Sequence, residues 1–266
     1  MKWFTFLKRQ KTPAIFGLAL GSGGAKGMAH LGALKAFEEA NITFDVVAGA
    51  SIGSIVGAMY SAGYSSGDIY RMIKNLDLKE AAAAVLLRAD GLAYVISRVL
   101  DGLEDFSELQ KPFSAVTTDL KTGECVVLNQ GRLAESLSAS SAMPPYFRPV
   151  TVDGRVCIDG AFSSSVPSDV CRQMGANFVV AIDLATYTES ASQSQKPLLD
   201  KLFPGNGVQP GEARTRGRLA ADIVIDPVLT GYRASDFGKM EQMFEIGYEA
   251  AKRAIPEILA AKKRLS

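Results

Sequence analysis

The stretch VVAGASIGS, residues 46–54, places a serine between two glycines at the end of an apolar run. Gly49, Ser51 and Gly53 form the pattern G-x-S-x-G, which presents a serine hydroxyl as a nucleophile where a strand turns sharply into a helix. Glycines on both sides let the backbone turn without side-chain clashes. Ser51 is therefore the candidate nucleophile, and its base has to be found elsewhere in the chain.

Strand and helix patterns alternate around this stretch. Apolar runs predict strands over residues 14–20, 42–48, 112–119, 123–129, 177–184 and 221–228, and helical spacing predicts helices over 25–40 and 52–62. Turn residues between 119 and 123, and the Asp153-Gly154 pair, predict two hairpins. The alternation favours an α/β layered fold, with a central mostly parallel sheet and some antiparallel hairpins.

A second G-x-S-x-G match occurs in GYSSG, residues 63–67, and acts as an internal control. Ser65 follows a helical stretch instead of a strand. Gly63 is placed to end that helix, and Ser66 or Asp68 to cap the next one. The sequence context therefore favours Ser51 over Ser65.

The segment LGSGGAKGMAHLG, residues 20–32, gathers glycines where a strand leads into a helix. Backbone amides at such a junction suit a phosphate or a developing oxyanion. The dinucleotide pattern G-x-G-x-x-G fails because Lys26 occupies its last glycine position, and the pattern G-x-x-x-x-G-K-[ST] has no match in the segment. An oxyanion site is favoured, and a nonstandard phosphate site is the alternative.

The base is the open question, because the chain has one histidine. His30 shares a helical stripe with Ala33, Leu34 and Phe37, which favours a packed core residue over a catalytic base. Asp-Gly pairs begin at residues 90, 101, 153 and 159. Asp159 ends a short predicted strand, which would expose its carboxylate at a strand end, but composition alone does not choose among the four.

Composition describes an ordinary globular protein. Of the 266 residues, 47% are hydrophobic and 21% charged, and the net charge of +1 gives no global basic field for nucleic acid. Three scattered cysteines predict neither a disulfide framework nor a zinc site, and they favour a reducing, cytoplasmic compartment. Ligand residues do not cluster, so we expect neither metal nor cofactor.

The chain is predicted to form one domain over residues 13–266. Residues 1–12 are expected to be a flexible basic-aromatic arm, with a foothold on a membrane surface as the alternative. Residues 186–218 are rich in Ser, Gln, Gly, Pro and Arg, which predicts a mobile loop or lid. No apolar run reaches the length of a membrane span.

Three motifs together resemble the bacterial patatin-like phospholipases: GSGGAKG at 21–27, GASIG at 49–53 and DGA at 159–161. The resemblance extends over about residues 15–185 and includes SASSAMPPYFRPV. It implies a patatin-like fold and a Ser-Asp dyad, with Ser51 as nucleophile and Asp159 as base. It also implies an oxyanion loop with backbone amides of Gly23, Gly24 and Ala25, and Lys26 at the place of a basic residue common in the family.

The resemblance implies hydrolysis of lipid esters, with phospholipids or lysophospholipids as substrates. A thioesterase or acyltransferase using the same acyl-serine intermediate is one alternative, and a regulatory adaptor with incidental esterase activity is another. The expected location is the cytoplasm, with peripheral attachment to the inner membrane face left open. A histidine-free dyad further predicts a pH–rate profile without a step near pH 6.5, the pKa of free histidine.

Overall fold

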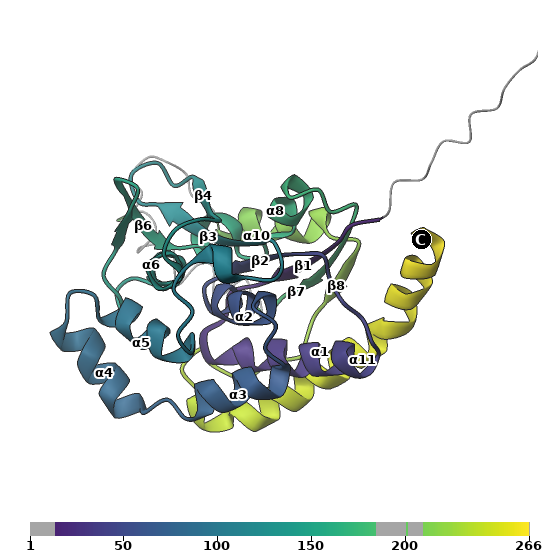
Figure 1. Cartoon of the computed structure of the whole chain (residues 1–266), viewed down its shortest axis with the longest axis horizontal. Coiled ribbons are helices and arrows are strands. Elements are labelled where there is room, and N and C mark those ends of the chain that lie inside the picture. Colours follow the sequence, from purple (N-terminus) through teal and green to yellow (C-terminus); the bar gives the residue numbers. More distant parts are fainter. Residues whose placement is uncertain (1–13, 185–200, 202–209, 266) are drawn as a thin grey trace, which may run out of the picture.

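The computed structural model describes residues 14–184, 201 and 210–265. An eight-stranded sheet forms the centre of the molecule, in the order β5-β6-β3-β2-β1-β7-β8, with β4 paired to β3 (Figure 1). The strands are β1 (Phe16–Leu20), β2 (Val46–Ala50), β3 (Phe113–Asp119), β4 (Cys125–Leu128), β5 (Val150–Val152), β6 (Arg155–Asp159), β7 (Phe178–Ile182) and β8 (Ile223–Ile225). Five neighbouring strands, β3, β2, β1, β7 and β8, run parallel.

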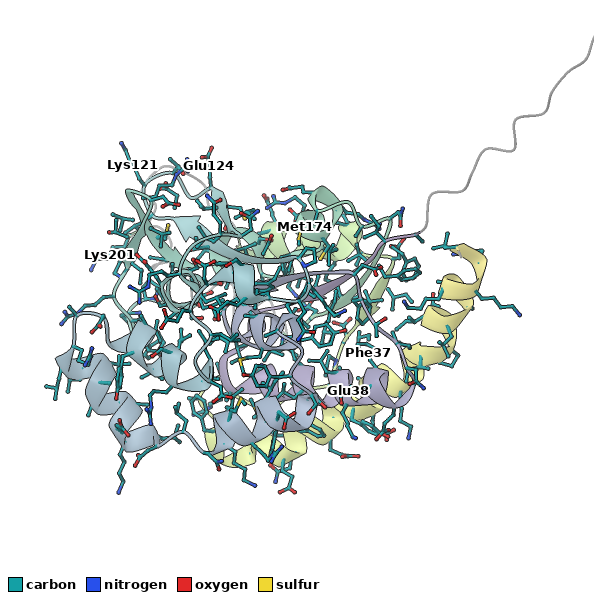
Figure 2. The ribbon with its side chains drawn as sticks, viewed as in Figure 1. Phe37, Glu38, Lys121, Glu124, Met174 and Lys201 are labelled. Atoms are coloured by element: carbon teal, nitrogen blue, oxygen red, sulfur yellow. The ribbon has the colours of Figure 1, made fainter. Side chains whose placement is uncertain are left out.

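Helices cover both faces of this sheet, which confirms the predicted α/β layering. One face packs against α1 (Met28–Glu39), α2 (Ile52–Ser61) and α11 (Met240–Leu265), and the other against α7 (Ala161–Ser164), α8 (Ser168–Gln173) and α10 (Pro210–Ala220). Side chains of β1 alternate between the two layers: Leu18 and Leu20 lie in the core beneath α1, and Ala19 in the smaller core beneath α8. Figure 2 shows Phe37 on the side of α1 that faces the sheet.

The antiparallel part of the sheet is built on β3. The β3–β4 hairpin carries Lys121 and Glu124 at its turn, where both side chains point away from the sheet (Figure 2). β5 and β6 form the second predicted hairpin. Its turn residues Asp153 and Gly154 have φ of 48° and 76°, a left-handed pair that suits a tight two-residue hairpin turn.

The register of β3 explains how distant parts of the chain meet. β2 pairs along β3 as far as Ala50 opposite Val116, and β6 pairs with β3 starting from Asp159 opposite Thr117. β4 occupies the other side of β3 at these same residues. β2 and β6 therefore lie on one side of β3, and because they run in opposite directions, their carboxyl ends meet.

Two sequence predictions need correction. The strand expected at 42–48 forms at Val46–Ala50. Ile42 and Phe44 precede the strand, and their side chains are buried in the core, where the Phe44 ring lies 5.3 Å from that of Phe37. The irregular segment expected at 186–218 contains α10, whose arginines bind aspartates of the sheet layer. The predicted arm at 1–12, and the predicted lid before residue 210 apart from Lys201, lie outside the described residues.

The described residues form further helices around these layers. They are η1 (Gly24–Gly27), α3 (Ser66–Lys74), α4 (Leu78–Leu87), α5 (Gly91–Val99), η2 (Phe106–Glu108), α6 (Leu133–Ser140) and η3 (Phe237–Lys239). α4 packs mainly against α5 at the periphery of the molecule (Figure 1), which leaves Leu86 and Leu87 75% and 80% exposed. None of the described helices has the length and apolar content that crossing a membrane requires.

Candidate active site

Ser51 lies at the turn between β2 and α2, as the sequence predicts. Its backbone has φ 53° and ψ −126°, a conformation that costs a non-glycine residue free energy and that persists only where surrounding contacts hold it. Gly49 and Gly53 allow the turn to close: a Cβ on Gly49 would lie 2.3 Å from the Gly53 oxygen, and one on Gly53 2.2 Å from the Leu20 oxygen. The two glycines of the motif are therefore required by backbone packing.

The hydroxyl of Ser51 donates a hydrogen bond to Asp159, with 2.7 Å between Ser51 Oγ and Asp159 Oδ2. Asp159 is fully buried, and its other oxygen accepts the backbone N–H of Ala161 at 2.8 Å. Burial raises the pKa of Asp159 to about 6, against the lowering effect of the hydrogen bonds from Ala161 and Ser51. The structure thus brings the two predicted residues together and makes the carboxylate a stronger base than free aspartate.

The glycine-rich loop packs against the turn at Ser51. Gly27 contacts Ile52 so closely that a Cβ there would lie 2.2 Å from the Ile52 side chain. Gly24 has φ 57° and begins η1. Within the described part of the chain, the amides of Gly23 and Gly24 have no backbone acceptor. These two N–H groups are the ones in the loop available to a ligand.

Ala25 differs from the expectation for an oxyanion donor. Its backbone N–H donates to the Ala234 carbonyl at 2.7 Å, in the segment that precedes η3. That amide is therefore engaged within the protein. Lys26 is half-buried, and burial lowers its pKa, while the nearby Asp236 carboxylate acts in the opposite direction.

His30 lies in the core, as its helical stripe predicts. The side chain is fully buried, and Nε2 lies 2.8 Å from the Gly21 oxygen. Because a carbonyl only accepts, Nε2 carries the proton. Burial lowers the pKa of His30 to about 4, so the ring is neutral at pH 7. His30 fixes the start of the glycine loop, because its hydrogen bond in the described structure goes to Gly21 and not to Ser51.

The control serine, Ser65, caps a helix. Its hydroxyl accepts the Asp68 N–H at 3.2 Å and donates to the Asp68 carboxylate at 2.6 Å, at the start of α3. The cap is therefore Ser65 itself and not the predicted Ser66 or Asp68. Gly63, with φ 96°, follows the end of α2 as predicted.

Ser140, which the sequence analysis did not single out, also touches the site. Its hydroxyl accepts the backbone N–H of Ser51 at 3.0 Å. The run SLSASS contains four serines without a pattern that distinguishes one from another, so only the fold identifies this contact. Among the described residues, no group of three or more His, Cys, Asp or Glu side chains is arranged to hold a metal ion.

Sequence comparison places this chain in a known family. The family model of patatin-like phospholipases matches residues 18–172. Human patatin-like phospholipase domain-containing protein 6 is 29% identical over 94% of this chain, and neuropathy target esterase sws of Drosophila melanogaster is 30% identical over 70% of it. These alignments span only 21% and 14% of the two relatives' own lengths.

The fold is also similar to solved structures. Human GIVD cytosolic phospholipase A2, in complex with methyl gamma-linolenyl fluorophosphonate, matches 95% of this chain and 59% of its own, with a TM-score of 0.57 and 14% identity. VipD from Legionella pneumophila matches 93% of this chain and 68% of its own, with a TM-score of 0.53 and 16% identity. With its family model covering more than half of its length, this chain belongs to the patatin-like phospholipase family.

Proposed function

We propose that this protein is a serine hydrolase that cleaves carboxylic esters of phospholipids or lysophospholipids through Ser51 and Asp159. The observation that carries the proposal is the 2.7 Å hydrogen bond from the Ser51 hydroxyl to a fully buried carboxylate, at a strained strand-to-helix turn. A hydroxyl in contact with a base is the arrangement that activates a serine nucleophile. Membership of the patatin-like phospholipase family supports lipid esters as the substrate class.

In the proposed reaction, Asp159 takes the hydroxyl proton of Ser51 as Oγ attacks the ester carbonyl carbon. The resulting oxyanion accepts hydrogen bonds from the amides of Gly23 and Gly24, and the amino end of α2 favours the negative charge. The tetrahedral intermediate then expels the alcohol, which takes the proton from Asp159, and leaves an acyl group on Ser51. Water, deprotonated by Asp159, attacks this acyl-serine; the bond between Ser51 Oγ and the acyl carbon breaks, the fatty acid leaves, and Asp159 returns the proton to Ser51 Oγ.

Burial of Asp159 raises its pKa, which allows a carboxylate to act as the base in place of histidine. A free aspartate titrates near 3.9, about 2.6 units below histidine. The pKa of about 6 for Asp159 removes most of that difference. Losing one oxyanion donor typically costs about 100- to 1000-fold in rate, so the glycine loop is expected to contribute as much as the base.

We further propose that the protein meets its substrate at a membrane surface, in the cytoplasm. The exposed apolar side chains of α4 support peripheral contact, because Leu86 and Leu87 have no core to pack against. Free thiols at Cys125, Cys157 and Cys171 support a reducing compartment.

The test is turnover of a short-chain p-nitrophenyl ester and of a lysophospholipid by purified protein. We expect wild type and Ser65→Ala to hydrolyse both substrates, and Ser51→Ala and Asp159→Asn to lose at least about 1000-fold in kcat. Ser65→Ala makes the same chemical change in the other G-x-S-x-G match, so it controls for loss of a serine as such. Turnover that survives in Ser51→Ala would contradict the proposal.

A further inference from the structure

The carboxyl end of α6 lies where β2 and β6 meet, and Ser140 is its last residue. The side chain of Ser140 is fully buried, and its Oγ makes two hydrogen bonds. It lies 3.0 Å from the Ser51 backbone nitrogen and 2.6 Å from the Val116 carbonyl oxygen. Ser140 therefore connects the turn at Ser51 to β3, the strand that both β2 and β6 pair with.

The chemistry of these groups fixes the direction of both bonds. A hydroxyl has one proton, and a carbonyl oxygen has none, so Ser140 donates to Val116. Its lone pairs are then directed to the N–H of Ser51, which is a donor only. Alanine at position 140 would leave both the Ser51 N–H and the Val116 carbonyl without this partner, in a buried place where an unpaired polar group is costly.

The backbone of the same segment holds the other half of the pair. The carbonyl of Ser140 accepts the N–H of Gly160 at 3.0 Å, and the carbonyl of Ala142 accepts the N–H of Asp159 at 3.1 Å. The last carbonyls of a helix lack partners within the helix. Here the N–H of Gly160, just after β6, pairs with the last carbonyl of α6, and the N–H of Asp159 pairs with a carbonyl just beyond it. Ser140 thus contacts the residue next to the base with its main chain and the nucleophile with its side chain.

From this geometry we infer that Ser140 is a positioning residue that holds the Ser51 turn in register with Asp159, a role that rests on the proposed function. Ser51 adopts a φ of 53°. This backbone conformation is unfavourable for serine and persists only when surrounding contacts stabilise it. The Ser140 hydroxyl is the side chain that holds its amide. Without it the turn relaxes toward ordinary backbone angles, and Ser51 Oγ moves away from Asp159 Oδ2.

The chain offers a matched control at the next position. Ser141 is also buried, and its hydroxyl has no hydrogen-bond partner among the described residues. Ser141→Ala therefore removes the same atom from the same segment without breaking a bond. Ser140→Cys is a conservative variant, because sulfur is a weak acceptor and a thiol a weak donor in place of the hydroxyl.

The first readout is the kinetics of a soluble p-nitrophenyl ester. We expect Ser140→Ala to lose about 10- to 100-fold in kcat with KM within about threefold, Ser140→Cys to fall between it and wild type, and Ser141→Ala to stay within about twofold. The Ser51 hydrogen bond lowers the pKa of Asp159, so its loss in Ser140→Ala moves the lower inflection of the pH–rate profile to higher pH. A defect in folding alone would reduce the amount of active enzyme and leave that inflection in place.

The second readout is independent of activity: hydrogen exchange of the Ser51 amide. We expect it to be protected in wild type and Ser141→Ala, and to exchange at least about tenfold faster in Ser140→Ala. Equal protection in all three proteins, an unmoved inflection, or wild-type kcat in Ser140→Ala would overturn the inference. If wild type itself turned over no ester, the proposed function would fail, and selective loss of protection in Ser140→Ala would still support the positioning role.

Discussion

At the scale of single residues, the site depends on where a carboxylate and an imidazole are buried. Asp159 and His30 are both fully buried, but burial acts on their pKa values in opposite directions. It raises the pKa of the acid to about 6 and lowers that of the histidine to about 4. The order of the two side chains as bases is thereby reversed relative to their free forms, and Asp159 alone contacts Ser51.

This reversal changes the expected pH dependence. The histidine-free dyad predicted a profile without a step near 6.5, whereas the buried Asp159 introduces one of its own near 6. Only the carboxylate form accepts the Ser51 proton, so kcat/KM should rise with pH through about 6 and level off above it. The measurement is the pH–rate profile of wild type and His30→Gln on a soluble ester.

His30→Gln distinguishes the two possible sources of that step. We expect the inflection near 6 to persist in this variant, because burial lowers the pKa of His30 to about 4, so its ring is already neutral near pH 6, and because it contacts Gly21 instead of Ser51. An inflection that disappears with His30 would assign the base to the histidine.

At this scale the sequence predicted the candidate nucleophile but did not by itself choose the candidate base. G-x-S-x-G after an apolar run identifies Ser51, because the pattern describes a local turn. Four Asp-Gly pairs have the same local signature, and Asp159 was selected by resemblance to a family. Ser140 carried no signal, because its role arises from contacts with residues 89 and 24 positions away.

At the scale of elements, the parallel strands and both hairpins were predictable from apolar runs and turn residues. The meeting of β2 and β6 on one side of β3 was not, because register between distant strands is not written in either strand alone. The strand expected at 42–48 was misplaced for a related reason. Buried loop residues such as Phe44 look like strand residues when only hydropathy is visible.

The α10 helix shows how charge pairing organises a segment that composition suggests is irregular. Asp183, buried at the end of β7, accepts hydrogen bonds from Arg214 and Arg218, both at 2.7 Å. Arg218 also binds Asp226 through two nitrogens. Removing one partner of a buried ion pair leaves the remaining charge poorly compensated.

We therefore expect Arg218→Gln to lower the free energy of unfolding by about 2 kcal/mol, a value reduced from that of a fully buried pair because Arg218 is partly exposed. Urea unfolding followed by circular dichroism measures it. Arg253→Gln, an exposed arginine of α11, is the control and should stay within about 0.5 kcal/mol of wild type. Equal free energies of unfolding for the two variants would show that the ion pairs of Arg218 do not stabilise the fold.

At the scale of the whole molecule, the proposed membrane contact requires the exposed Leu86 and Leu87 of α4 to lie at the same end of the molecule as Ser51. Figure 1 shows α4 at the end of the molecule toward which β1 runs, and the turn at Ser51 follows the same end of the neighbouring parallel strand β2. A membrane in contact with α4 would thus lie at the carboxyl ends of β1 and β2, where Ser51 is located.

The double variant Leu86→Asp, Leu87→Asp tests this arrangement. Replacing two exposed leucines by aspartates removes apolar contact and adds repulsion from anionic lipid, so we expect sedimentation with phosphatidylglycerol-containing vesicles to fall about tenfold or more. Hydrolysis of a soluble ester should be unchanged, because α4 packs mainly against α5 in the described structure, and the two leucines are exposed.

Leu219→Asp on α10 is the matched control, since Leu219 is 81% exposed and lies on another helix. It should leave vesicle binding within about twofold of wild type. Vesicle binding that is equally reduced in both proteins, or in neither, would contradict a membrane contact through α4.

The most direct test of the central claim is the site of covalent labelling by a fluorophosphonate. Peptide mass spectrometry of the labelled protein should find one adduct per chain, on the peptide that contains Ser51. Labelling should be absent in Ser51→Ala, about 100-fold or more slower in Asp159→Asn, and unchanged in Ser65→Ala. An adduct on another residue, or labelling of Asp159→Asn at the wild-type rate, would contradict a reaction in which Asp159 activates Ser51.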